Sequence, residues 1–224
     1  EISGSRLRNN LQSFRDTLSS DTRLMAVVKS NAYGHGLSVV SNVIRDQVDW
    51  FGVDSLAEAL EVQHVAPGKP VLILGYSRIE YAAEIVRREF RQVTYRQDVA
   101  HALSEAANDI GKPARIHLKI ETGTNRQGIP LNEVAAFSQF VSRLPGIEVE
   151  GVYTHFANIE DTLDPSFAKL QLERFGKAIA EIGEAGIRPA HVHADATAGI
   201  LLYPETHFSM VRLGIGAYGI WPSR

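Results

Sequence analysis

The chain has 224 residues, 44% of them hydrophobic and 22% charged, and a formal net charge of −3 at pH 7. This composition is ordinary for a globular protein and gives no electrostatic reason to expect binding to nucleic acid or to an anionic membrane surface. Cysteine is absent, which excludes a disulfide framework, thiolate catalysis and a cysteine-ligated metal, and favours a cytoplasmic location. No apolar run approaches the roughly 20 residues of a membrane span, and we expect no signal peptide. Because the first residue is Glu1, we expect a chain trimmed at its N-terminus.

Hydrophobic spacing predicts helices and strands in regular alternation. The predicted helices cover residues 3–19, 37–46, 56–64, 81–89, 98–110, 131–143, 165–185 and 197–202. The predicted strands cover residues 24–28, 50–53, 71–74, 92–95, 115–121, 146–154, 190–193 and 210–213. Eight strands in this alternation predict an α/β fold, a closed (β/α)8 TIM-type barrel of parallel strands that forms a single domain over residues 1–224. One strand fewer would admit an open doubly wound sheet instead. No clear helix follows the eighth strand, and the first helix is expected to take its place.

The fifth predicted strand carries polar residues where a buried parallel strand is normally apolar. Arg115, His117, Lys119 and Glu121 alternate with apolar residues, so they must be paired if they face the interior. Further polar residues stand near the ends of the last three strands: His155, His191, His193 and Arg212. Each of them alone fits an internal ion-pair network. As a set they indicate a site at the carboxyl ends of the strands, where barrel enzymes keep their chemistry.

A lysine stands at the end of the first predicted strand. Residues 25–28 are apolar, Lys29 follows them, and a glycine-rich loop leads into the next helix. The pattern alone leaves open a functional lysine and one that only caps the strand. The segment Ala26-Val-Val-Lys29-Ser-Asn-Ala-Tyr33-Gly-His-Gly36 closely resembles the cofactor-lysine segment of alanine racemases, which depend on pyridoxal 5′-phosphate (PLP). The resemblance implies that Lys29 is catalytic and carries PLP as a Schiff base, and that Tyr33 hydrogen-bonds the cofactor phosphate.

A second match lies at the fifth strand and its loop. His117-Leu-Lys119-Ile-Glu-Thr-Gly-Thr-Asn-Arg126 is similar to the racemase segment whose arginine approaches the PLP phenolic oxygen and the substrate carboxylate. The resemblance implies that Arg126 binds the substrate and that Lys119, carbamylated in many members, supports it. Thr124 replaces the usual methionine of this loop, a change that we expect to be tolerated.

Two further segments match near the C-terminal end. Tyr153-Thr-His155-Phe-Ala157 resembles the family motif whose histidine hydrogen-bonds the arginine corresponding to Arg212. Val211-Arg212-Leu-Gly214-Ile215-Gly-Ala-Tyr218-Gly219 resembles the segment that supplies this arginine, which faces the pyridine nitrogen, and two backbone amides for the phosphate. The resemblance places His155, Arg212, Gly214 and Ile215 among the cofactor-binding residues.

One segment departs from the family pattern. His193-Ala-Asp195-Ala196-Thr197-Ala-Gly199 aligns with a stretch that usually reads His-x-Ala-Asn-Ser-Ala. Thr197 can replace the phosphate-binding serine because both residues carry a hydroxyl. Ala196 stands at the asparagine position, so either Asp195 substitutes for the asparagine or the phosphate end is held more loosely.

The resemblance implies a PLP-dependent racemase that interconverts L- and D-alanine and supplies D-alanine for peptidoglycan, with no metal. The substrate is a small amino acid, and alanine, serine or a broader range remains open. In the family a tyrosine from a C-terminal β-domain of the other subunit supplies the second acid/base. Nothing here matches that domain, so we expect poor activity from these 224 residues alone and a homodimer for the full-length protein.

The alternatives are a single-domain PLP-homeostasis barrel without racemase activity, and a PLP-free barrel that holds a sugar phosphate at Gly214 and Ile215.

Overall fold

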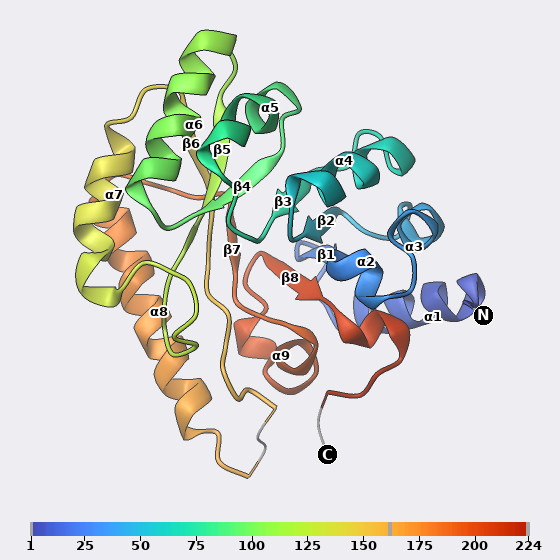
Figure 1. Ribbon diagram of the computed structural model, residues 1–224. Coiled ribbons are helices and arrows are strands. Elements are labelled where there is room, and N and C mark those ends of the chain that lie inside the picture. Colours follow the sequence, from blue (N-terminus) through green and yellow to red (C-terminus); the bar gives the residue numbers. More distant parts are fainter. Residues whose placement is uncertain (1, 161–162, 223–224) are drawn as a thin grey trace. The chain divides into compact units, whose positions relative to one another are not determined.

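The structure, a computed structural model, describes residues 2–160 and 163–222 (Figure 1). The chain divides into two compact units. The first unit consists of residues 1–75 and 193–224, and the second unit consists of residues 76–192. Each unit is described by itself.

The first unit is built on four parallel strands in the order β8-β1-β2-β3. The strands are β1 (Arg23–Val27), β2 (Trp50–Val53), β3 (Val71–Ile73) and β8 (Met210–Leu213). All of their residues except Arg23 are buried, as expected for parallel strands that are covered on both faces. Ala26 of β1 pairs with Leu213 of β8, so these two strands end side by side at their carboxyl ends.

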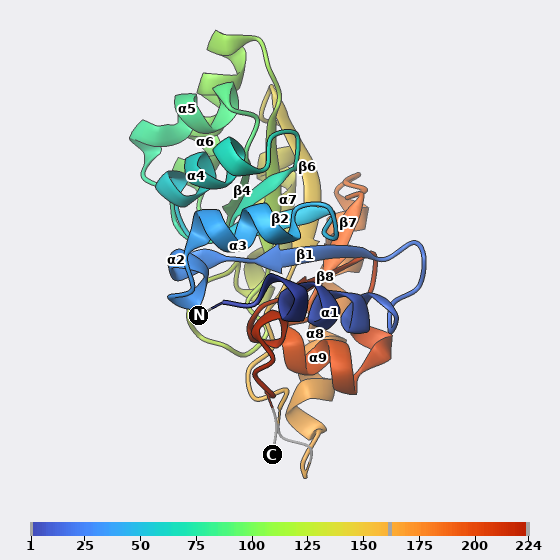
Figure 2. The same ribbon diagram turned by 90° about the vertical axis from the view of Figure 1, so that its right-hand side faces the viewer.

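The helices of the first unit follow or precede these strands. They are α1 (Gly4–Arg15), α2 (Lys29–Tyr33), α3 (Leu37–Ile44), α4 (Leu56–Val65) and α9 (Thr197–Leu202), with short 3-10 turns η3 (Pro204–Thr206) and η4 (Ile215–Tyr218). The Ser3 hydroxyl caps α1, which buries Leu7 and Leu11 and packs against α3 and η4 (Figure 2). The first helix therefore packs against the turn that follows the eighth strand, as predicted.

The second unit contains β4 (Arg91–Thr94), β5 (Ala114–Lys119) and β6 (Ile147–Tyr153), and the chain leaves it through β7 (His191–His193). Its helical elements are η1 (Ile79–Tyr81), α5 (Ala82–Arg87), α6 (Gln97–Ile110), η2 (Leu131–Glu133), α7 (Val134–Ser142) and α8 (Ser166–Glu184). Helix α5 packs on α6, and α7 lies beside α8, drawn in yellow and orange in Figure 1. The apolar faces of α6, α7 and α8 are buried and include Leu103, Val141 and Phe175.

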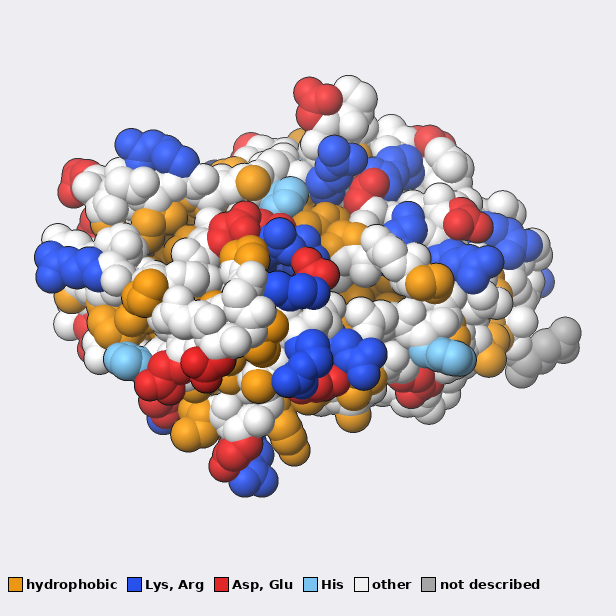
Figure 3. Space-filling view, turned by 90° about the horizontal axis from the view of Figure 1, so that it is seen from above, with side chains coloured by type: hydrophobic (Ala, Val, Ile, Leu, Met, Phe, Trp, Pro, Cys, Tyr) orange, Lys and Arg blue, Asp and Glu red, His pale blue; other side chains and the backbone are white. Residues whose placement is uncertain are grey.

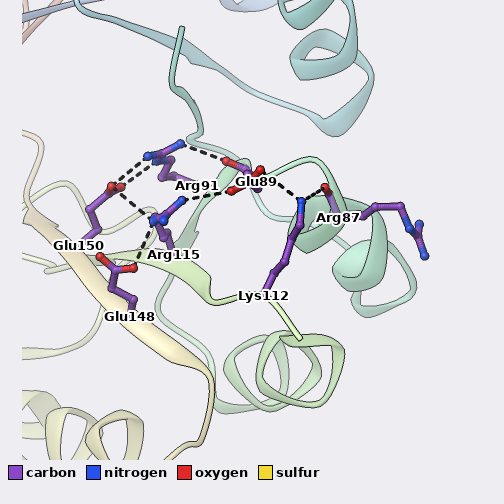
Figure 4. A network of polar contacts seen from close by, with 7 residues as sticks. All are labelled: Arg87, Glu89, Arg91, Lys112, Arg115, Glu148 and Glu150. Atoms are coloured by element: carbon purple, nitrogen blue, oxygen red, sulfur yellow. Dashed lines mark hydrogen bonds and ion pairs between the residues drawn. The ribbon is translucent and has the colours of Figure 1, made fainter. Parts of the chain in front are cut away.

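The polar residues of β5 are paired, as the sequence requires. Arg115 meets Glu148 at 3.1 Å, and the buried His117 ring meets Glu150 at 3.4 Å. Arg91 of β4 forms a bidentate ion pair with the same Glu150, with N···O distances of 2.9 and 3.0 Å (Figure 4). Basic and acidic side chains also lie next to one another on the face drawn in Figure 3. The network balances charges at the beginnings of β4 and β5 and within β6.

In the part of the chain that the structure describes, eight strands alternate with helices, and the fold class is the predicted (β/α)8 TIM-type barrel of parallel strands. The observed strands begin and end within two residues of the predicted ones. The sequence did not predict α2, η3 or η4. None of the described helices is long and apolar enough to cross a membrane.

Candidate functional site

Lys29 lies just after β1, at the start of a left-handed backbone turn. The N–H of Val28 still donates to the Gly52 carbonyl at 2.8 Å, and the chain then enters α2. Four consecutive residues of α2 have φ between 53° and 55°: Ser30, Asn31, Ala32 and Tyr33. A left-handed turn of non-glycine residues costs roughly 1–2 kcal/mol per residue. Such strain persists only where the surroundings fix it, and it is concentrated at functional sites.

Hydrogen bonds on both sides hold this turn. Asn31 accepts from the Leu37 N–H through its side-chain oxygen at 2.8 Å, which joins the turn to α3. The Glu58 carboxylate accepts from the N–H groups of Asn31 and Asp54 at 3.2 and 2.8 Å. The turn therefore fixes the direction in which Lys29 leaves the strand. No described residue makes a hydrogen bond or ion pair with the Lys29 amine.

The other end of the turn places Tyr33 against the segment after β8. A Cβ atom added to Gly214 would lie 2.8 Å from the Tyr33 hydroxyl oxygen, so only glycine allows this approach. The Tyr33 ring meets Tyr218 edge-on at 5.7 Å, and His35 stacks on Tyr218 at 4.4 Å. Burial raises the pKa of both tyrosines above the ordinary value. Both phenols therefore keep their protons and can donate hydrogen bonds.

The segment after β8 presents main-chain donors close to this phenol. The N–H groups of Gly214 and Ile215 donate to no described residue. The Thr197 hydroxyl at the start of α9 accepts from the Gly216 N–H at 3.1 Å, so its own proton remains available. Free amides at the start of a turn, with hydroxyls beside them, form a site that suits an anion such as phosphate.

Arg212 of β8 is held inside the first unit, with 4% of its surface exposed. Its guanidinium donates to the His193 ring nitrogen Nδ1 at 2.7 Å and to the Ala194 carbonyl at 2.9 Å. A guanidinium can only donate, so Nδ1 of His193 must be the unprotonated nitrogen. Within the first unit His193 is therefore a partner of Arg212. The predicted hydrogen bond between His155 and Arg212 stays a prediction.

Lys119 and Arg126 lie in the second unit. Lys119 is 2% exposed, donates to the Gln127 side chain at 3.1 Å and lies 5.7 Å from the centre of the Tyr153 ring. Arg126 stands on an exposed loop. The Glu121 carboxylate organises that loop by accepting from the Gly123 N–H at 2.6 Å and from the Arg126 N–H at 3.3 Å.

His155 follows β6 in the second unit and is half-buried. Of the predicted site residues, the first unit brings six to the carboxyl ends of β1, β7 and β8: Lys29, Tyr33, Thr197, Arg212, Gly214 and Ile215. The second unit holds Lys119, Arg126 and His155.

Sequence reasoning missed three residues that position this site. His193 had been noted only as a polar residue at a strand end, and its place as the first residue of the segment that departs from the family pattern was the available signal. Tyr218 and Glu58 gave no signal, because an aromatic residue in a loop and an acidic residue on a helix are common. Their roles depend on contacts with residues far away in the sequence.

The fold and the site first define a class, a parallel (β/α)8 barrel with an amine and an anion site at neighbouring strand ends. The family model described as the alanine racemase N-terminal domain matches residues 2–222. The chain therefore belongs to the alanine racemase family.

Known relatives agree with this membership. The chain is 38% identical over 224 residues to an alanine racemase of Symbiobacterium thermophilum and 35% identical over 225 residues to one of Methanococcus maripaludis. These matches span 100% of this chain but 59% and 60% of the relatives. Among solved structures, alanine racemase of Clostridium difficile 630 in complex with cycloserine superposes with a TM-score of 0.92 at 30% identity, covering 98% of this chain and 60% of that one.

Proposed function

We propose that this chain is the cofactor-binding part of a PLP-dependent racemase that interconverts L- and D-alanine. The observation that carries the proposal is the position of Lys29 at the end of β1, next to the anion site at the end of β8. The pairing of Ala26 with Leu213 fixes this neighbourhood. The similarity to proteins named alanine racemase supports it, and favours it over a carrier barrel without activity.

The residues present fit PLP. The phosphate would be held by the hydroxyls of Tyr33 and Thr197 and by the N–H groups of Gly214 and Ile215. The lack of a side chain at Gly214 is what allows Tyr33 to come close, since a Cβ there would lie 2.8 Å from the phenol oxygen. Arg212 would face the ring nitrogen, and the amine of Lys29 would bond the aldehyde.

PLP, when bound, supplies an electron sink that makes the α-proton of an amino acid removable. Lys29 then moves that proton on one face of the substrate through its Nζ atom, which must be uncharged when it acts as the base. Arg212 keeps its own proton, because a guanidinium does not ionise in proteins. It would therefore donate a hydrogen bond to the ring nitrogen of bound PLP without protonating it. The His193 acceptor fixes the direction of the guanidinium.

We propose that the second unit contributes substrate contacts. Arg126 would bind the substrate carboxylate, Lys119 would support that arginine, and His155 would take part in holding the cofactor. A second acid/base is needed on the opposite face of the substrate. We propose that a tyrosine of a further domain, contributed by the other subunit of a homodimer, supplies it. We also propose a cytoplasmic location.

A trapping experiment tests the assignment of Lys29. The purified protein is incubated with PLP, reduced with borohydride and digested, and the modified peptide is identified by mass spectrometry. We expect the label on Lys29 and its loss in Lys29→Ala, while Lys177→Ala, which changes an exposed lysine of α8, stays labelled. A label spread over surface lysines would contradict the proposal.

A chiral assay of the full-length protein tests the reaction. We expect L-alanine to be converted to the racemic mixture and Lys29→Ala to be inactive. Faster turnover of serine would redefine the substrate, and absence of turnover for every small amino acid would favour the carrier.

A further inference from the structure

Asp195 carries a carboxyl group that is fully buried and only half satisfied. The residue follows β7 in the first unit and has 0% of its surface exposed. One oxygen, Oδ1, lies 2.5 Å from the Thr206 hydroxyl oxygen. The other oxygen, Oδ2, is buried and has no hydrogen-bond partner among the described residues. An ionised carboxylate in this position would leave a charged oxygen without a partner, which is strongly unfavourable.

The hydrogen bonds of Thr206 indicate where the proton lies. Its hydroxyl oxygen also lies 2.7 Å from the main-chain carbonyl of Tyr203. A carbonyl can only accept, and Thr206 has a single hydroxyl proton, so with an ionised Asp195 that one proton would have to serve both contacts. A second proton satisfies both contacts, and only the carboxyl group can supply it.

We propose that in mildly acidic solution Asp195 is a protonated carboxylic acid that donates to Thr206, ties the end of β7 to η3, and so positions Thr197 for binding phosphate. Residues 195 and 197 are separated by one residue, and Thr197 itself accepts from Gly216. The hydrogen bond between Asp195 and Thr206 joins the two ends of the segment that contains α9. The role of Thr197 rests on the proposed function, whereas the protonation of Asp195 does not.

The surrounding charges agree with this assignment. Burial raises the pKa of Asp195 to about 6, against the opposing effects of Thr206, His207 and Arg212. Glu205 adds to the rise. His207 donates from Nε2 to the Ile200 carbonyl at 3.0 Å, because a carbonyl can only accept. His193, two residues before Asp195, is occupied by Arg212.

The sign of the pH effect follows from this rise. The folded protein binds the Asp195 proton more tightly than the unfolded chain does, so the contribution to stability is complete below the unfolded pKa of 3.8 and is lost as pH rises through about 6. The family pattern has alanine at this position, so such a titration would be particular to chains with an acid here.

The test compares Asp195→Asn, Asp195→Ala and Thr206→Val with the wild type in urea unfolding between pH 4 and pH 8. Asparagine keeps a donor for Thr206 and does not titrate. We expect the unfolding constant of the wild type to rise relative to that of Asp195→Asn by roughly fiftyfold from pH 4 to pH 7, since most of a shift of about two pKa units is expressed over that range. Thr206→Val removes the acceptor and tests the tie if Asp195→Ala fails to fold.

If the ratio of the unfolding constants of wild type and Asp195→Asn stays constant from pH 4 to pH 8, the proposal is overturned. The second measurement is the ratio of PLP dissociation constants of wild type and Asp195→Asn at pH 5.5 and pH 8, in which the titration of PLP itself cancels. We expect Asp195→Asn to retain its affinity and the wild type to weaken at the higher pH. A constant PLP ratio with a changing stability ratio would leave Asp195 protonated but remove its positioning role. Failure of PLP to bond Lys29 at all would instead overturn the proposed function.

Discussion

The guanidinium of Arg212 and the ring of His193 form a buried pair, with Nη1 2.7 Å from Nδ1. Both side chains come from strand ends, β8 and β7, and both are buried. Because Arg212 only donates, the pair fixes the histidine tautomer as well as the direction of the guanidinium. A permanently charged donor is thereby held in a fixed direction at the carboxyl end of β8.

We expect His193→Ala to destabilise the protein by about 1–3 kcal/mol, because it removes the acceptor of a buried charged donor. The free energy of unfolding in urea measures this effect. His101→Ala, at an exposed position on α6, is the control and should change little. Equal stabilities of the two variants would show that Arg212 finds another acceptor.

Gly214→Ala should weaken PLP binding by about tenfold or more, because a hydrogen bond to a charged group contributes about 1.5–3 kcal/mol. The new Cβ would lie 2.8 Å from the Tyr33 hydroxyl oxygen and must displace the phenol. Titration of PLP followed by absorbance measures the affinity. The control is Gly176→Ala in α8, where an added Cβ meets nothing within 4 Å. Unchanged affinity in Gly214→Ala would remove Tyr33 from the phosphate site.

The same substitution should have opposite effects at two exposed serines. Ser30 has φ 55°, so Ser30→Gly relieves left-handed strain of roughly 1–2 kcal/mol and loses roughly 0.5–1 kcal/mol in chain entropy. We expect a net gain of about 0.5–1 kcal/mol. Ser13→Gly, in the right-handed helix α1, should instead destabilise by about 0.5–1 kcal/mol. The free energies of unfolding of both variants are measured in urea without PLP. A loss of stability in Ser30→Gly would contradict the interpretation that the turn is strained.

The network of Glu150 predicts sensitivity to acid. Burial raises the pKa of Glu150, but hydrogen bonds from His117 and Arg91 outweigh it and bring the pKa down to about 2. The folded pKa is lower than the ordinary 4.5, so this contribution to stability is present above pH 4.5 and is lost as pH falls toward 2. Burial also lowers the pKa of His117, which acts in the same direction below pH 6.5.

We therefore expect Glu150→Gln to lose about 1–3 kcal/mol at pH 7 and to lose less than the wild type between pH 4.5 and pH 2. Urea midpoints at pH 7, 4.5 and 3 measure both effects. Glu173→Gln, at an exposed ion pair with Lys177 on α8, should leave the pH profile unchanged. Parallel pH profiles of Glu150→Gln and the wild type would show that the network does not titrate with folding.

Much of the fold and part of the site could be predicted from the sequence because they depend on local patterns. Apolar runs such as residues 24–28 and helical spacing such as that of Leu7 and Leu11 determined the order of strands and helices. Alternating polar residues in β5 required partners, and the structure supplies Glu148 and Glu150. Lys29, Tyr33 and Arg212 were found because they stand in recognisable segments at strand ends.

What only the tertiary structure decided are features made by residues far apart in the chain. The left-handed turn after Lys29 contradicts the local preference of Ser30 and Ala32, and it persists because Glu58 and the Leu37 N–H hold Asn31 from outside the turn. Arg212 meets His193 although the two residues are 19 positions apart in the chain and no described strand pairing joins β7 to β8. The proton of Asp195 is a third case, since burial and the single hydroxyl proton of Thr206 set it, and neither can be deduced from the sequence alone.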